Sequence, residues 1–223
     1  NLQVKEQLIP SDGKSITDKN GIAKITLKLG SKAKESGYQV QANFSGEKEL
    51  NASFTVTAIS SKPYEIKKHQ GDNQSGFVGK KADSDLSVKV VDKYDNPVED
   101  VEVNWGFDGV PLNTQNHKLE PNPSVSDKYG IARTSLTYGT RTGNYIVSAY
   151  KQGLNGSPVV FSKLIAEIIP GKADKLTRVS PTQDPIKGVV GTTTEELVVK
   201  LVDEFGNTVE GETIDFTLDQ DRS

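Results

Sequence analysis

Two Asp-rich stretches contain the residue types that bind metal ions. Asp92, Asp95 and Asn96 fall within five consecutive positions, and Asp203 begins a similar group. Carboxylate and amide oxygens are the ligands that calcium prefers, and the ion takes about six to eight of them. Neither stretch has the spaced carboxylates and terminal Glu of an EF-hand loop. Because Asp also begins turns by accepting a hydrogen bond from the backbone two residues on, we interpret both stretches as turns, with calcium at Asp92, Asp95 and Asp203 as the alternative.

Other residues suited to catalysis are few. His69 and His117 are the two histidines, and the chain has no cysteine. A Ser-His-Asp site needs its base held against a nucleophile, and no Gly-x-Ser-x-Gly elbow is present. The absence of cysteine excludes thiolate nucleophiles and Cys-ligated zinc. The sequence therefore predicts a protein that is not an enzyme, with both histidines on the surface and no cofactor apart from the calcium alternative.

Charge and hydropathy argue against a nucleic-acid partner and against membrane insertion. The 223 residues include 27 basic and 30 acidic side chains, and the formal charge is −3. These charges are spread along the chain, without the dense basic patch that binds a phosphate backbone. The longest apolar stretches are far shorter than the roughly 20 residues that span a bilayer. We expect no nucleic-acid partner and no membrane insertion in this segment.

The chain repeats itself with a period of about 110 residues. Asp18–Ala23 (DKNGIA) returns as Asp127–Ala132 (DKYGIA), 109 positions later. A second stretch, Leu86–Trp105, returns as Leu197–Phe216, 111 positions later. A period of this length is the size of one small domain, so each repeat is predicted to be a structural unit.

The order of the two motifs defines the bounds of the units. The first motif closes a unit and the second opens one. We therefore assign residues 1–60 to the C-terminal half of a repeat, 61–170 to a complete repeat, and 171–223 to the N-terminal half of another. Turn residues at Ser60–Pro63 and Pro170–Lys172 mark the two boundaries.

Apolar residues alternate with polar ones in both copies of the motifs, which is the pattern of a strand with one buried face. No stretch of ten residues has a helical spacing of apolar positions, and turn residues separate the short strands. This predicts an all-β fold of sandwich or barrel type. The alternation predicts the structural core, which comprises Trp105, Phe216, Val103, Ile214, Leu136, Leu27, Tyr145 and Tyr38.

The motifs resemble the bacterial Ig-like repeats of the invasin and intimin adhesin family. In that family a strand ends in Asp and a Gly-Asn-Pro-Val turn follows; a Thr-Asp-x-x-Gly-x-Ala stretch and a Gly-x-Tyr-x-Val-x-Ala strand come later. Asp95 and Asp100 stand where the family has glycines, and Thr208 stands where it has proline. The matching stretches are Asp92–Asp100, Asp203–Gly211, Thr17–Ala23 with Gly37–Ala42, and Ser126–Ala132 with Asn144–Ala149.

The resemblance implies tandem Ig-like β-sandwich domains of Greek-key type, exported and placed in series as a stalk on a bacterial cell surface. It also implies that any host receptor is bound through domains outside this chain. The expected function is thus a structural spacer whose partners are neighbouring repeats or other copies of itself.

Two further functions stay open from the sequence. The half-repeats at 1–60 and 171–223 would leave strand edges unpaired. Either the chain is a piece of a longer array whose ends fall within repeats, which we favour, or one copy completes the next and builds a surface fibre. A carbohydrate-binding accessory module is the third hypothesis. It would need an exposed aromatic platform or a pocket with convergent acids, and the sequence shows neither.

Overall fold

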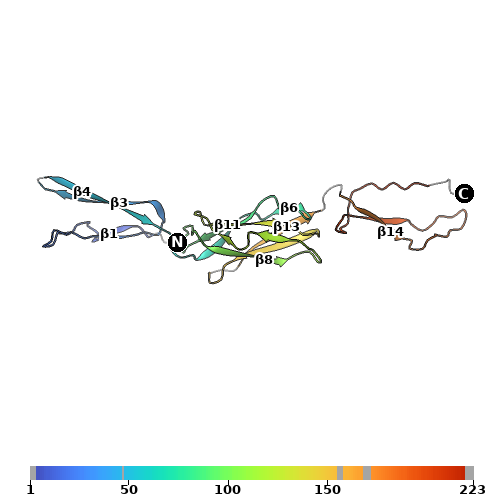
Figure 1. Cartoon of the computed structure of the whole chain (residues 1–223), viewed down its shortest axis with the longest axis horizontal. Helices are drawn as coiled ribbons and strands as arrows, with labels where there is room; N and C mark the ends of the chain where they lie inside the picture. The colour runs from blue at the N-terminus through green and yellow to red at the C-terminus, as the bar shows by residue number, and fades with distance from the viewer. Residues whose placement is uncertain (1–3, 47, 155–157, 168–171, 219–223) are drawn as a thin grey trace.

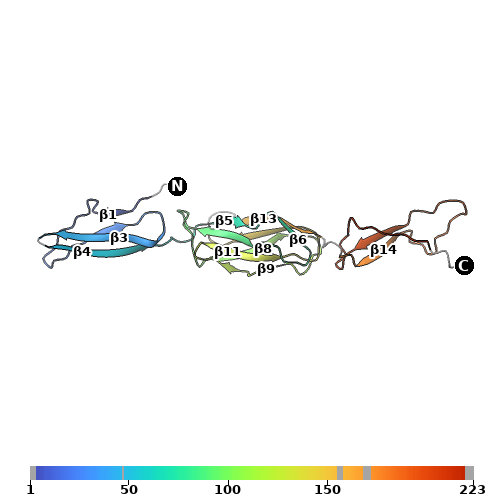
Figure 2. The ribbon, with the colours of Figure 1, turned by 90° about the horizontal axis from the view of Figure 1, so that it is seen from above.

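The computed structural model of the chain is all-β, as the sequence predicted, and describes residues 4–46, 48–154, 158–167 and 172–218. Its strands form three bodies in a row along the long axis of the molecule (Figures 1 and 2). We call residues 4–58 the first segment, 61–167 the middle repeat and 172–218 the third segment. In the described part of the chain, no helix is long and apolar enough to cross a membrane.

The middle repeat is a sandwich of two sheets. Strand neighbours are antiparallel, except that β13 runs parallel to β6. The order resembles the two sheets of an Ig-type sandwich. One sheet has the order β5 (Glu65–Gln70), β7 (Leu86–Val91), β11 (Ile131–Thr137), β9 (Lys118–Glu120). The other has the order β10 (Ser124–Val125), β8 (Glu102–Gly109), β12 (Gly143–Tyr150), β13 (Val159–Glu167), β6 (Gln74–Phe77).

The hydrophobic core lies between these two sheets. Period-two alternation directs one face of each strand inward, and the core includes Val103, Trp105, Leu136 and Tyr145. The indole of Trp105 is buried and donates a hydrogen bond from Nε1 to Ser124 Oγ at 2.8 Å. The one tryptophan of the chain therefore reports on the packing of the middle repeat alone.

The first segment has the strands that end a repeat. β1 (Gln7–Ile9) pairs with β2 (Thr26–Lys28), and β3 (Lys34–Ser45) forms a long hairpin with β4 (Glu49–Ala58). By the repeat period these strands correspond to β9, β11, β12 and β13. Within the described residues of this segment, no strand corresponds to β5, β7 or β8.

The third segment has the strands that begin a repeat. β14 (Lys175–Ser180) pairs with β15 (Val198–Val202), as β5 pairs with β7 in the middle repeat. Residues 212–218 correspond to β8 but are not in a strand. In the middle repeat β8 is hydrogen-bonded to β12 and β10, and no described strand occupies those positions beside 212–218.

Four predicted core residues are not buried in the chain. Phe216 is 63% exposed, and Leu27, Tyr38 and Ile214 are partly exposed. All four lie in the two end segments, where the facing sheet is incomplete. Apolar alternation specifies which face turns inward, whereas burial needs a second sheet to cover that face.

Candidate functional site at the junctions between repeats

Each Asp-rich stretch folds into a turn that is braced by the Asp carboxylate. Asp92 Oδ1 accepts the backbone N–H of Tyr94 at 2.8 Å and that of Asn96 at 2.9 Å. Asp203 Oδ1 accepts the corresponding N–H groups of Phe205 at 2.9 Å and Asn207 at 2.8 Å. The two turns directly follow β7 and β15, which are equivalent strands of the repeat. Each turn therefore lies at the same end of its unit.

The same turn occurs again in the other repeated motif. Asp127 Oδ1 accepts the N–H of Tyr129 and of Ile131, and Asp18 makes the equivalent bonds in the first segment. The turns differ at their fifth residue, which is Ile131 after Asp127 but Asn96 after Asp92. An asparagine at this position has an amide that can reach beyond its own turn.

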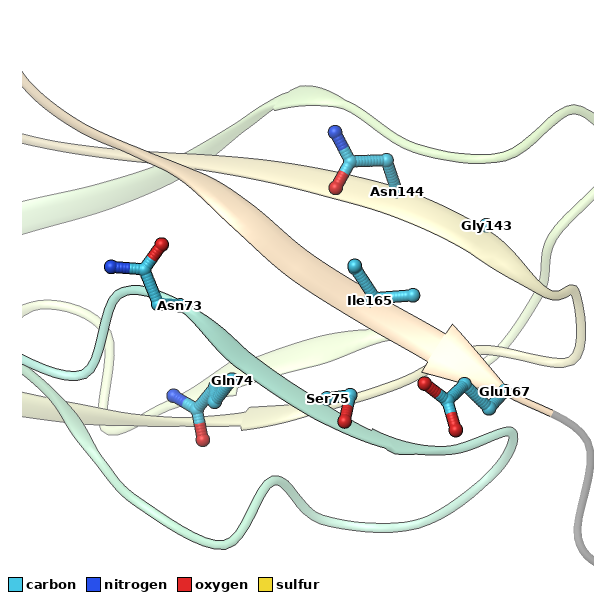
Figure 3. Close-up of a pocket in the computed structure, with 7 residues that line it drawn as sticks. All are labelled: Asn73, Gln74, Ser75, Gly143, Asn144, Ile165 and Glu167. Carbon is cyan, nitrogen blue, oxygen red and sulfur yellow. The ribbon is translucent and has the colours of Figure 1, made fainter.

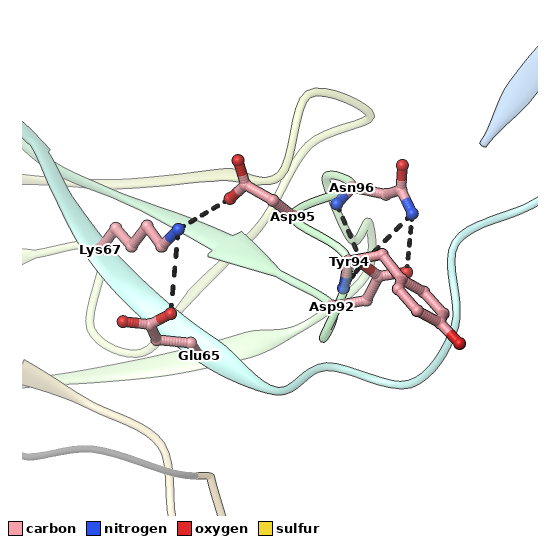
Figure 4. Close-up of polar contacts among 6 residues, drawn as sticks. All are labelled: Glu65, Lys67, Asp92, Tyr94, Asp95 and Asn96. Carbon is pink, nitrogen blue, oxygen red and sulfur yellow. Dashed lines mark hydrogen bonds and ion pairs between the residues drawn. The ribbon is translucent and has the colours of Figure 1, made fainter. Parts of the chain in front are cut away.

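Asn96 joins the middle repeat to the first segment. Its Nδ2 donates to the Ser31 carbonyl oxygen at 2.8 Å, and its Oδ1 accepts the backbone N–H of Ala33 at 3.0 Å. Nδ2 also donates to Asp92 Oδ2 at 3.0 Å (Figure 4). Asp92 Oδ2 in addition accepts the N–H of Ser61, at 2.9 Å. The side chain of Asn96 thus satisfies two backbone groups of the neighbouring segment while it is held by its own turn.

Asn207 repeats this arrangement between the third segment and the middle repeat. Its Nδ2 donates to the Thr140 carbonyl oxygen at 2.8 Å, and its Oδ1 accepts the N–H of Thr142 at 3.4 Å. Nδ2 again donates to the Asp of its turn, Asp203, at 2.9 Å. Both junctions use the same bonds. We use the term joint for the Asp of the turn, its Asn and the two backbone groups of the preceding unit that the Asn contacts.

The loop that receives the Asn is also built alike on both sides. At the first junction the Ser31 hydroxyl accepts the N–H of Val4, and the Ser31 N–H donates to the Val4 carbonyl. At the second junction Thr140 forms the same two bonds with Gln115. A hydroxyl residue therefore fixes the loop and leaves its own carbonyl free for the incoming amide.

A tyrosine corner supports the receiving loop of the middle repeat. The Tyr145 hydroxyl donates to the Arg141 carbonyl at 3.1 Å and accepts the Gly139 N–H at 3.0 Å. It also lies 2.8 Å from Thr114 Oγ1. A Tyr near the start of a strand, bonded back to the upstream backbone, is a feature of Ig-type sandwiches. Here it brackets Thr140, the residue that Asn207 contacts.

The three calcium candidates do not form a ligand set. Asp92 and Asp203 are buried, and their oxygens accept N–H groups of their turns. Asp95 points to the opposite side of the turn and pairs with Lys67 at 2.8 Å, beside Glu65 (Figure 4). Among the described residues, no group of three or more acidic, His or Cys side chains could hold a metal ion. The carboxylates brace turns in this structure.

Electrostatics keep the Asp92 carboxylate ionised. Burial alone would raise its pKa, but hydrogen bonds from Asn96, from the backbone of Ser61 and from the backbone of Tyr94 lower the pKa below its ordinary value. The pKa of Asp95 is lowered as well, chiefly by its hydrogen bond to Lys67. Since the folded-state pKa of Asp92 lies below the unfolded one, ionisation stabilises the folded state.

This shift predicts a loss of stability in acid. The contribution of Asp92 should be complete above its unfolded pKa of about 3.9 and should decline as pH falls through the lower folded pKa. Urea unfolding followed by Trp105 fluorescence between pH 6 and pH 2.5 measures this. Asp92→Asn should be less stable at pH 6 and should show a flatter decline. An equally steep decline in the variant would show that Asp92 does not contribute to it.

An open groove of about 580 Å³ lies beside β6, β12 and β13 (Figure 3). Its lining has one carboxylate, Glu167, one apolar side chain, Ile165, and no aromatic residue. The amide of Gln74 is engaged with the backbone of Gly71 and Ser84. The groove therefore lacks the aromatic platform and the paired acids that a sugar-binding or hydrolytic site needs.

The two histidines lie apart. His69 is exposed, and its Nδ1 is 3.0 Å from Ser87 Oγ. His117 is half-buried, in contrast to the predicted surface position, and its ring packs edge-on against Phe107 with centroids 4.7 Å apart. The packing of the loop that precedes β9 accounts for this burial. Neither histidine contacts a described nucleophile–acid pair.

Sequence reasoning recognised the Asp turns but missed the residues that join the repeats. In the sequence, Asn96 and Asn207 stand out only as turn residues, and nothing distinguishes Ser31 and Thr140 from other loop residues. The fifth position of the turn, Asn in one motif and Ile in the other, was the available sign. The role of this asparagine depends on the backbone of the neighbouring segment, which the pattern within one repeat does not specify.

Comparisons with known proteins give distant structural likenesses. No family model and no curated protein matches the chain. A structure of surface layer protein SbsC, domains 4–9, is similar at 14% identity with a TM-score of 0.39, over 93% of this chain and 28% of that one. The D0-D1 domain of intimin is similar at 23% identity with a TM-score of 0.30, over 72% of this chain and 81% of that one. The chain spans about a quarter of a second surface-layer structure, rSbsC, at 24% coverage. These three likenesses are distant, with TM-scores between 0.30 and 0.39.

Proposed function

We propose that the chain is a non-enzymatic spacer of a bacterial cell-surface adhesin, in which the joints hold successive Ig-like repeats in a fixed alignment. The observation that carries this proposal is the recurrence of the joint. Asn96 and Asn207 each donate to a carbonyl of the preceding unit at 2.8 Å. A spacer must hold each repeat in a fixed orientation relative to the one before it. The same contact at both junctions would fix that orientation in the same way at each.

The chemistry of the joint suits this role. Each joint is made of short side chains and backbone groups, and Asp92 and Asn96 are almost fully buried. Hydrogen bonds to an ionised carboxylate are stronger than those between neutral groups. The joint bonds to the neighbouring unit are made between a side-chain amide and backbone groups of the chain itself.

Removing the Asn amide of one joint should allow the two units at that junction to move relative to each other and should leave the other junction unchanged. The chain has no cysteine, so spin labels can be placed at single introduced cysteines: Glu49→Cys and Val125→Cys span the first junction, and Val125→Cys with Val190→Cys spans the second. Electron–electron double resonance should give narrow distance distributions for both pairs. Asn96→Ala should broaden the first distribution only, and Asn207→Ala the second only.

The two variants control for each other, and Trp105 fluorescence checks that the middle repeat stays folded. Narrow distributions in both variants would show that the joint does not set the alignment. Broad distributions in the unmodified chain would contradict the spacer role itself.

A further inference from the structure

The chain enters and leaves the middle repeat at opposite ends. Its first strand, β5, begins at Glu65 beside the first junction, and its last strand, β13, ends at Glu167 beside the second (Figures 1 and 2). A spacer that holds two objects apart is pulled at both ends when those objects separate. Tension on the chain therefore reaches the repeat from its two ends, in opposite directions.

The entering strands are held along the line of this pull. β5 pairs with β7 in one sheet, and the chain then crosses to β6 in the other sheet. There β6 lies beside β13 (Figure 3), with Gln74 opposite Leu164 and Phe77 opposite Glu167. β6 runs parallel to β13, whereas the other described strand pairs of the repeat are antiparallel. We call the hydrogen bonds between these two strands the β6–β13 ladder.

The parallel direction decides how tension acts on this ladder. Pull from the first junction acts on β6 at its start, and pull from the second acts on β13 at its end. The two strands are thus drawn past each other along their length, and because the ladder bonds lie across this direction, all of them carry the load together. The antiparallel β5–β7 pair is also loaded along its length, but its loss leaves β6 and β13 joined.

Contacts at both ends of β6 hold it in place. At its start, the Gln74 amide donates to the carbonyl oxygens of Gly71 at 2.6 Å and Ser84 at 3.0 Å, and it accepts the Ser84 N–H at 3.1 Å. At its end, the Val78 N–H donates to the Glu167 carbonyl at 2.9 Å. These bonds oppose peeling of β6 from either end, so the ladder is loaded as a whole.

The middle of β6 packs directly on the core. A Cβ at Gly76 would lie 2.5 Å from Cε2 of Tyr138, whose side chain is fully buried. The Tyr138 hydroxyl lies 3.4 Å from the Gln74 carbonyl oxygen. Because Gly76 has no side chain, the ring lies against the backbone of the strand and supports it.

We propose that the middle repeat is a load-bearing unit in which the β6–β13 ladder resists tension along the chain. The biological use of this resistance rests on the proposed spacer function, whereas the ladder itself is a property of the repeat. Forced unfolding is governed by the unfolding rate and not by the equilibrium stability. A ladder whose bonds must break together therefore protects the repeat specifically against pulling from its two ends.

Pulling single molecules of the whole chain in two directions tests the proposal. The chain has no cysteine, so handles attach only at introduced ones. Ile59→Cys with Lys172→Cys loads the repeat from both ends. Leu112→Cys with Lys172→Cys loads it from the second junction alone, since Leu112 lies in the loop that bonds to Thr140, and it peels β13 from its end. All three handle sites are exposed.

The pair at both ends should unfold at a force several times that of the pair at one end, at the same pulling speed. Equal forces would overturn the proposal. The spin-label distances across the two junctions are independent of this result, so narrow distributions with equal forces would leave the spacer function intact.

Val78→Pro tests the ladder itself. Val78 is the second residue of a turn in which the Lys80 N–H donates to the Phe77 carbonyl at 3.0 Å and Gly79 has a φ of 70°. These are the features of a type II turn, whose second position favours proline. The variant thus removes the N–H that bonds to Glu167 with little backbone strain. It should lower the unfolding force of the pair at both ends and leave that of the pair at one end nearly unchanged.

Val78→Ala is the matched control, because it keeps the N–H and removes part of a buried side chain. Urea unfolding of both variants, followed by Trp105 fluorescence, gives their equilibrium stability. Val78→Pro should be the mechanically weaker of the two, even where Val78→Ala is the less stable. A force that follows equilibrium stability alone in both variants would overturn the role of the ladder.

Discussion

Replacing Asp92 with Ala is expected to lower the free energy of unfolding of the middle repeat by roughly 2–4 kcal/mol, since it removes a charged acceptor of several hydrogen bonds. The side chain is 2% exposed and accepts the N–H groups of Tyr94, Asn96 and Ser61. Without it, the buried N–H of Asn96 and the partly buried N–H groups of Tyr94 and Ser61 lose their acceptor. Urea unfolding followed by Trp105 fluorescence measures the loss.

The matched control is Asp127→Ala. Asp127 braces the same type of turn through Tyr129 and Ile131, but its turn has no joint asparagine and its side chain is 37% exposed. This variant should lose about 0.5–1.5 kcal/mol, the usual net value of such bonds, and the label distance across the first junction should stay narrow. If Asp92→Ala and Asp127→Ala behave alike in both measurements, the buried carboxylate has no special role at the junction.

Replacing Tyr145 with Phe is expected to cost about 1–3 kcal/mol, because a buried donor is left without its acceptor. The Gly139 N–H loses the Tyr145 hydroxyl, and the Arg141 carbonyl loses its donor. The ring itself remains in the core, so the change isolates the hydroxyl. The receiving loop at Thr140 should loosen as well, which would broaden the label distances between Val125→Cys and Val190→Cys.

Tyr38→Phe is the control for the corner. Tyr38 is the counterpart of Tyr145 in the first segment, and among the described residues its hydroxyl has no hydrogen bond. The change should affect neither Trp105 unfolding nor the second junction. A Tyr145→Phe chain with unchanged stability but a broadened junction would assign the corner to the joint alone, whereas unchanged values of both would contradict any structural role of the hydroxyl.

The fold class followed from local patterns. Leu86, Val88 and Val90 alternate with polar residues and lie fully buried in β7, as period-two alternation predicts. The Asp turns were predictable too, because an Asp carboxylate that accepts the N–H two residues on acts within its own turn. The repeat period then indicated how many units such strands would build.

Burial at the chain ends did not follow from the same patterns. Phe216 has the alternation of Trp105 and occupies its position in the repeat, yet it is exposed where Trp105 is buried. Whether an inward face is covered depends on strands that lie elsewhere in the sequence or in another molecule. The alternation could therefore identify the face and not its environment.

Strands, turns and the repeat period are local properties, and the amino-acid order was sufficient to determine them. The joint needed the tertiary structure. Asn96 contacts the backbone of Ser31 across 65 positions of sequence, and Asn207 contacts that of Thr140 across 67. A backbone carbonyl carries no sequence identity, so no residue pattern could name the partner. Only the path of the chain through two sheets brings each turn against the preceding loop, and there a turn asparagine becomes the link between repeats.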